Sequence, residues 1–215
     1  MLRSFKVFTL FDIPVYLHST FLLMLLIVSV ANPTQGLLFL TAFTFVLFHE
    51  FGHCLAAKYC NLEAKSITML PFGGLAQIGD SSVDPRKELF VTIAGPLVNA
   101  VFAILLSIPI LMIDITTVPE WLSISIIICW WINMLLFVFN LLPCFPLDGG
   151  RIFRALLNLY WGDKIRATRV AVIVGRFFAC GMMAAGVYFS IYMWVILGLV
   201  LMFLANMEKA AIEGN

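Results

Sequence analysis

Charged residues are scarce in this 215-residue chain, where Asp, Glu, Lys and Arg make up 12% of the sequence; soluble domains have about 25%. Hydrophobic residues make up 62%, and the mean hydropathy is +1.04. This composition excludes an ordinary soluble domain and predicts an all-α polytopic membrane protein in contact with membrane lipid. The net charge of +1 gives no basis for binding nucleic acid, so no such partner is expected.

Paired cysteine motifs are also missing. The five cysteines include no CxxC pair and lie in or beside apolar stretches, where a free cysteine behaves as a small hydrophobic residue. Neither a disulfide framework nor a four-cysteine metal site is expected, and Cys144 is interpreted as a packing residue.

Six apolar stretches are long enough to cross a bilayer, which takes about 20 residues. They cover residues 16–32, 36–59, 88–113, 121–142, 166–185 and 187–206, with a turn near Gly186 between the last two. We expect one transmembrane domain over residues 1–215, with a core at about 36–155 and peripheral helices at about 16–32 and 166–206. An alternative for the first stretch is a cleaved signal peptide, but an uncleaved span keeps the charge pattern coherent.

Lysine and arginine occur before the first span, after the second and fourth, and at the C-terminal end, and are missing from the other loops. By the positive-inside rule both termini and the loops after spans two and four face the cytoplasm. An even number of spans is required for that arrangement.

Three ionisable side chains interrupt the apolar run from Thr41 to Ala57, in the string His49-Glu50-Phe51-Gly52-His53. Each costs about 2.5 to 3.5 kcal/mol at the bilayer centre on insertion scales, so a span that carries three is expected to use them. Four residues advance a helix by about 400°, so both imidazoles lie on one face and can bind one metal ion. Glu50 lies near enough to take a proton from water at that ion. The alternative is a chance match in which the histidines only form interhelical hydrogen bonds.

A third ligand is needed, because a catalytic zinc takes three protein ligands and leaves a fourth position open. Asp148 is expected to supply it, from the segment Asn140-Leu-Leu-Pro-Cys-Phe-Pro-Leu-Asp-Gly-Gly-Arg151 after the fourth span. The prolines and glycines predict irregular backbone, which membranes tolerate only when it is buried in protein or lines a watery cavity. Alternatively, Asp148 is solvated or caps a helix that begins near Gly150.

HExxH and the distant Asn-x-x-Pro-x-x-x-x-Asp-Gly segment together resemble the site-2 protease family of intramembrane zinc metalloproteases. The likeness extends to residues 94–99, which are similar to the family's Gly-Pro-x-x-Asn element. It implies regulated intramembrane proteolysis, the hydrolysis of a peptide bond in or near the transmembrane segment of a single-span regulatory protein. One zinc ion would be held by His49, His53 and Asp148, with Glu50 as general base. The zinc site would lie toward the cytoplasmic side.

The same resemblance suggests that Asn140 holds substrate or stabilises the oxyanion; an interhelical hydrogen bond is the alternative. Asn99 is expected to pack and hydrogen-bond near the core, as a residue of the second shell. His18 is interpreted mainly as an interfacial or helix-packing residue, with a role near the metal as the alternative. We find no insertion for a PDZ domain and no extension for a CBS pair, so regulation is expected from a membrane partner.

The segment between the second and third spans, residues 67–78, is too short to span and too apolar for a free loop. We expect a re-entrant β-hairpin, whose edge either pairs with an unwound substrate or only shields the site. Two other functions stay open: a zinc transporter or metal-binding scaffold, and a catalytically silent relative that binds clients. A transporter needs no base beside its ligands, and the two motifs show no inverted repeat.

Overall fold

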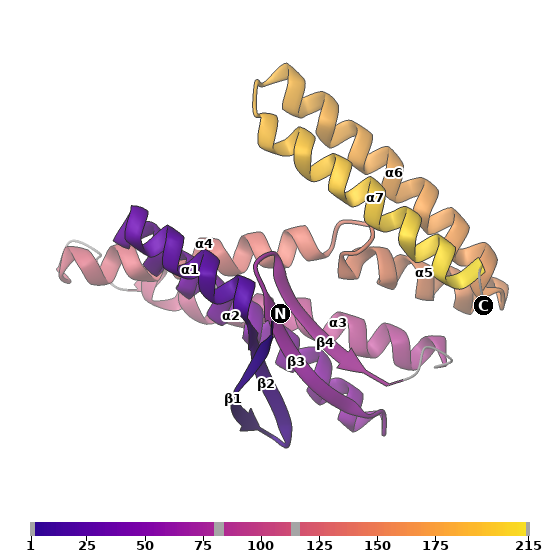
Figure 1. Ribbon diagram of the computed structural model, residues 1–215, viewed down its shortest axis with the longest axis horizontal. Coiled ribbons are helices and arrows are strands. Elements are labelled where there is room, and N and C mark those ends of the chain that lie inside the picture. The colour runs from indigo at the N-terminus through magenta and orange to yellow at the C-terminus, as the bar shows by residue number, and fades with distance from the viewer. Residues whose placement is uncertain (1–2, 80–83, 113–116, 214–215) are drawn as a thin grey trace. The chain divides into compact units, whose positions relative to one another are not determined.

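The computed structural model describes residues 3–79, 84–112 and 117–213, a part of the chain that is mainly helical (Figure 1). Within it the elements follow the order β1 (Ser4–Leu10), β2 (Ile13–His18), α1 (Ser19–Ala31), α2 (Pro33–Tyr59), β3 (Ala64–Leu70), β4 (Gly73–Ile78), α3 (Pro85–Met112), α4 (Glu120–Asn140), α5 (Asp148–Trp161), α6 (Lys164–Tyr188) and α7 (Tyr192–Glu213). The chain divides into two units, residues 1–81 with 94–137 and residues 82–93 with 138–215.

Five of the described helices are long and apolar enough to cross a membrane: α2, α3, α4, α6 and α7. They support a multi-pass integral membrane protein. The predicted count of six spans is not confirmed, because α1 has 13 residues, or about 20 Å at 1.5 Å per residue, against a hydrocarbon core of about 30 Å. The predicted first span was placed too early, since Tyr16 to His18 belong to β2.

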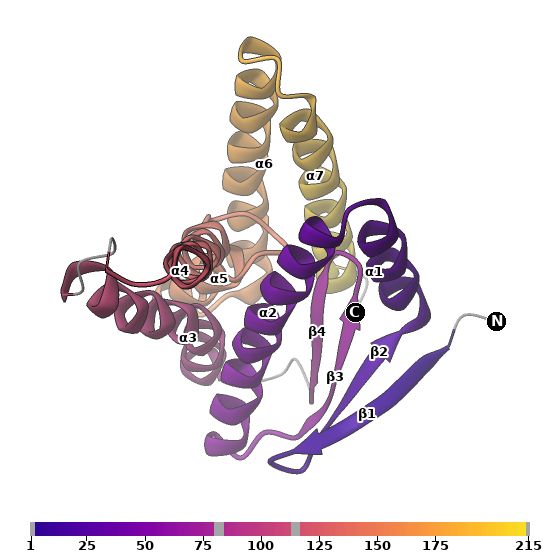
Figure 2. The ribbon, with the colours of Figure 1, turned by 90° about the vertical axis from the view of Figure 1, so that its left-hand side faces the viewer.

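The first unit contains a four-stranded sheet in the order β1-β2-β3-β4, with β2 and β3 parallel and the other pairs antiparallel. Alternate residues of β2 and β3 are buried and pack with Phe21 of α1 and Phe51 and Cys54 of α2: Ile13, Val15, Ile67 and Met69. This apolar layer holds the sheet beside α2 (Figure 2). The β1–β2 hairpin was not predicted.

The segment between α2 and α3 forms the antiparallel hairpin β3–β4. Gly73 has a φ of 146°, a backbone conformation that favours glycine, and it follows the exposed tip residue Phe72, whose surface is 97% accessible. The hairpin form therefore agrees with the sequence, while its re-entrant position in a membrane stays a prediction.

The second unit contains α5, the helical hairpin of α6 and α7 (Figure 1), and the first nine residues of α3. Small residues allow α6 and α7 to approach closely: a Cβ on Gly198 would lie 2.9 Å from the carbonyl oxygen of Ala179. The helices are joined at residues 189–191, slightly beyond the predicted turn at Gly186. Four buried residues form an apolar cluster beside them: Phe145, Ala171, Val172 and Ala205.

Candidate metal centre

The two histidines of the HExxH string lie on one face of α2 and are buried, with 5% and 8% of their surfaces exposed. Helix α2 begins cleanly because the Asn32 side chain accepts hydrogen bonds from the backbone N–H groups of Thr34 and Gln35. The Nε2 atoms of His49 and His53 are 3.1 Å apart. Two imidazole nitrogens at this separation can bind one metal ion.

Glycine in α3 leaves space in front of these nitrogens. A Cβ built on Gly95 would lie 2.7 Å from Nε2 of His49 and would also collide with the His53 ring. On the opposite helix, a Cβ on Gly52 would lie 2.8 Å from the carbonyl oxygen of Ala94. Glycines on both helices thus let α2 and α3 approach closely while leaving room at the imidazole nitrogens, and a metal ion fits this donor set.

A chain of buried amides supports His49 from behind. The Asn99 Oδ1 atom is 2.7 Å from His49 Nδ1, and Asn99 Nδ2 donates to Asn133 Oδ1 of α4 at 3.1 Å. Asn133 Nδ2 in turn donates to the backbone carbonyl of Cys129 at 2.9 Å. Asn99 and Asn133 are both fully buried. Asn99 therefore contacts a histidine of the site, while sequence reasoning missed Asn133, although an amide within a span was an available signal.

Glu50 is half-buried and points toward the β3–β4 hairpin. Its Oε2 atom accepts a hydrogen bond from the backbone N–H of Ala76 in β4, at 3.1 Å. A Cβ on Gly74 would lie 2.9 Å from the carboxyl carbon of Glu50, so only glycine lets the hairpin pass this close. The backbone of β4 thus fixes one oxygen of this carboxylate beside the histidine pair.

Asp148 lies in the second unit, where it is the first residue of α5 and is buried. The N-cap of α5 is Leu147, so the alternative that Asp148 caps this helix is wrong. Short hydrogen-bonded turns precede it, and a Cβ on Gly149 would collide with the backbone of Leu141 and Leu142. The expected irregular backbone is present, and it contains a cis peptide bond between Phe145 and Pro146.

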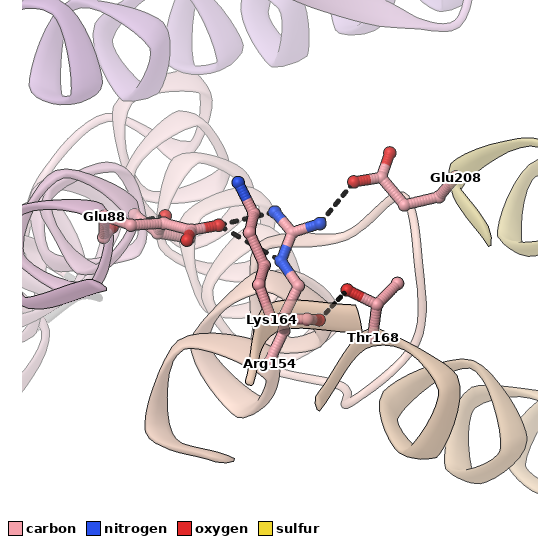
Figure 3. Close-up of polar contacts among 6 residues, drawn as sticks. Glu88, Arg154, Lys164, Thr168 and Glu208 are labelled. Atoms are coloured by element: carbon pink, nitrogen blue, oxygen red, sulfur yellow. Dashed lines mark hydrogen bonds and ion pairs between the residues drawn. The ribbon is translucent and has the colours of Figure 1, made fainter. Parts of the chain in front are cut away.

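Arg154, one and a half turns after Asp148, is the centre of an ion cluster in the second unit (Figure 3). Its guanidinium donates to Glu88 of α3 and to Glu208 of α7, each at 2.5 Å. The Arg154 Cζ atom also lies 5.2 Å from the centre of the Phe145 ring in the loop before Asp148. Sequence reasoning did not predict this cluster.

The remaining predicted residues lie at ends of helices. Asn140 is the last residue of α4. His18 is the N-cap of α1, and its Nδ1 atom accepts from the N–H of Thr20 at 3.3 Å. Cys144 is buried against Gly175 of α6, and burial raises the pKa of its thiol, as expected for an unreactive packing residue.

Comparison with known proteins identifies close similarity. The family described as peptidase family M50 matches residues 37–120 and 106–185. The solved structure of the site-2 protease from Methanocaldococcus jannaschii superimposes with a TM-score of 0.69 and 32% identity, covering 96% of this chain and 95% of that one.

Two curated relatives extend the similarity. A zinc metalloprotease of M. jannaschii is 33% identical over 98% of this chain and 62% of its own length. Stage IV sporulation protein FB of Bacillus subtilis is 33% identical over 53% of this chain and 38% of its own length. The chain thus spans less than two thirds of the length of these relatives.

Proposed function

Because this chain belongs to peptidase family M50, we propose that it is a zinc-dependent intramembrane endopeptidase. The observation that carries this proposal is the buried histidine pair of α2, with Nε2 atoms 3.1 Å apart in front of Gly95 and Glu50 next to it in the chain. The M. jannaschii relative, which matches almost the whole of this chain, is named a zinc metalloprotease.

One zinc ion would be held by His49, His53 and Asp148. Each of these buried residues offers one ligand atom, and imidazole nitrogen with carboxylate oxygen is a usual donor set for catalytic zinc. When bound, the zinc would supply Lewis acidity that polarises the scissile carbonyl and activates water.

Glu50 would act as the general base. Its carboxylate would take a proton from the attacking water and then give that proton to the nitrogen of the leaving amine. The hydrogen bond from the Ala76 N–H to Oε2 supports this role, because it fixes the carboxylate and leaves Oε1 to exchange the proton.

The substrate would be a single-span membrane-bound regulatory protein, cleaved in or near its transmembrane segment. Strand β4 has one neighbour in the described sheet, so its other edge offers backbone groups to an unwound substrate by β-augmentation. The exposed apolar tip at Phe72 supports a re-entrant position for the hairpin. Asn140 would donate its amide N–H groups to the substrate or the oxyanion.

We also propose a single transmembrane domain over residues 1–215, with both termini and the zinc site toward the cytoplasm. Helix α1 would be the sixth span, with the bilayer thinned locally around its 13 residues. Single cysteines replacing Lys6 and Lys209 in an otherwise cysteine-free chain test the orientation. Both should react with an impermeant maleimide only after the membrane is opened, and labelling of either one in intact cells would contradict the topology.

Regulation would come from a membrane partner that controls substrate entry. Of the alternatives, a zinc transporter or scaffold is not favoured, because the M. jannaschii relative is named a metalloprotease over nearly this whole chain. A catalytically silent relative that binds clients is distinguished by experiment.

That experiment compares membrane-protein fragments from cells carrying the wild-type chain or Glu50→Gln, at matched expression and by quantitative mass spectrometry. New termini inside transmembrane segments should appear with the wild type and disappear with Glu50→Gln. The purified variant should keep its zinc, whereas His49→Ala should lose it. Identical fragment sets from a folded, zinc-loaded Glu50→Gln variant and the wild type would refute the proposed proteolysis.

A further inference from the structure

We infer that Asn133 is a positioning residue, which fixes the orientation of Asn99 and through it the ring and tautomer of His49. This inference rests on the proposed function, in which His49 is a metal ligand. It concerns a residue of α4 that lies outside both motifs and does not itself touch the histidines in the printed contacts: its partners are Asn99 and the Cys129 carbonyl.

The direction of each hydrogen bond follows from the end of the chain that allows no choice. The backbone carbonyl of Cys129 can only accept, so the group of Asn133 facing it must be the Nδ2 amide. That orientation turns Oδ1 of Asn133 toward Asn99, and the group of Asn99 that meets it must be Nδ2, a donor.

With its Nδ2 committed to Asn133, Asn99 presents Oδ1 to the histidine. An amide oxygen can only accept, so Nδ1 of His49 must carry the proton across the 2.7 Å contact. In the neutral ring the lone pair then lies on Nε2. This is the nitrogen that faces Gly95 and His53, where the metal would bind.

Burial makes this orientation consequential. Asn99 and Asn133 are completely buried, and a buried amide that loses its partner bears the desolvation penalty of that group. Without Asn133, the Asn99 amide could rotate and present Nδ2 to the ring, which would favour the tautomer protonated on Nε2. Metal binding would then have to reverse both the amide and the tautomer.

The test measures zinc affinity of the detergent-solubilised full chain by competition with a chromogenic chelator. Asn133→Leu, which is close in volume, should weaken zinc binding about tenfold, the lower end of the 10- to 100-fold loss typical of residues that orient ligands. The matched control is Trp130→Phe, which removes another hydrogen bond between α4 and α3, from Trp130 Nε1 to Ser107 Oγ at 2.8 Å. The control should keep wild-type affinity.

A second background separates positioning from simple packing. In Asn99→Asp both side-chain oxygens accept, so His49 Nδ1–H keeps its acceptor whichever way the carboxylate turns. Adding Asn133→Leu to Asn99→Asp should therefore change zinc affinity less than twofold. If Asn133→Leu alone does not fold, Asn133→Asp, which retains the oxygen facing Asn99, should bind zinc within about threefold of wild type.

Several outcomes would overturn the inference while leaving the proposed metal site intact. These are wild-type affinity in Asn133→Leu, a tenfold loss in Trp130→Phe, or a tenfold loss in Asn133→Asp or on adding Asn133→Leu to Asn99→Asp. If His49→Ala retains zinc, it is the proposed metal site that fails, and the two failures are thereby distinguished.

Discussion

The histidine pair and Asp148 are held in place by different kinds of interaction. His49 and His53 lie within an uninterrupted helix, and His49 is supported by the neutral amides of Asn99 and Asn133. Asp148 follows an irregular loop, and the support nearest to it in sequence is the charged cluster of Arg154.

This difference follows from where each region lies in its helices. The two amides lie in the interior of apolar helices, where a charge costs more than a neutral polar group. The partners of Arg154 lie near helix ends: Glu88 is in the first turn of α3 and Glu208 is near the end of α7. The chain thus uses neutral hydrogen bonds inside its spans and ion pairs at their ends.

The largest expected effect comes from breaking the charged cluster with Arg154→Met. This change leaves Glu88 and Glu208 without their shared cation, and removing one partner of a buried ion pair destabilises by about 3 to 5 kcal/mol. The free energy of unfolding, measured by SDS titration in mixed micelles, should fall accordingly. Asn133→Leu should lower it by less, since an unpaired buried polar group costs about 1 to 3 kcal/mol.

Arg151→Met is the matched control for this experiment, because Arg151 lies on the same helix and is exposed. It should change stability by no more than about 0.5 kcal/mol. Adding Glu88→Gln to Arg154→Met should restore part of the loss, because it removes one uncompensated carboxylate. Equal stabilities of Arg154→Met and Arg151→Met would show that the cluster does not hold the second unit together.

The parts of the structure that sequence could predict are those that depend on periodicity and length. The five long apolar helices are found where hydropathy placed them, and spacing put the two imidazoles on one face of α2. The Pro and Gly residues around Asp148 correctly indicated irregular backbone, because they act through local steric restrictions.

The parts that sequence missed depend on tertiary contacts or on unusual backbone. The β1–β2 turn places Phe11 and Asp12 at φ values of 51° and 60°, where glycine and asparagine are the usual residues, so no turn signal was visible. Asn133 and Arg154 are single polar residues whose partners lie 34 and 66 positions away in the chain. No local pattern identifies such partners.

A smaller effect is expected from Gly95→Ala, which adds one methyl group beside the histidine pair. The added Cβ would lie 2.7 Å from His49 Nε2 and collide with the His53 ring, so a metal ion and the methyl group would compete for the same space. Zinc affinity should fall about 100-fold, equivalent to about 2.7 kcal/mol. The chelator competition described above measures it.

Gly181→Ala on α6 is the control, because nothing lies within 4 Å of a Cβ built there. Alanine is a better helix former than glycine by about 1 kcal/mol, so this control should be at least as stable as wild type and bind zinc normally. Loss of zinc from Gly95→Ala with the helices still folded would place the metal directly in front of Gly95. Normal zinc binding by Gly95→Ala would mean that the imidazole nitrogens bind their ion from another side, and the comparison with the Arg154 cluster would then lose its first member.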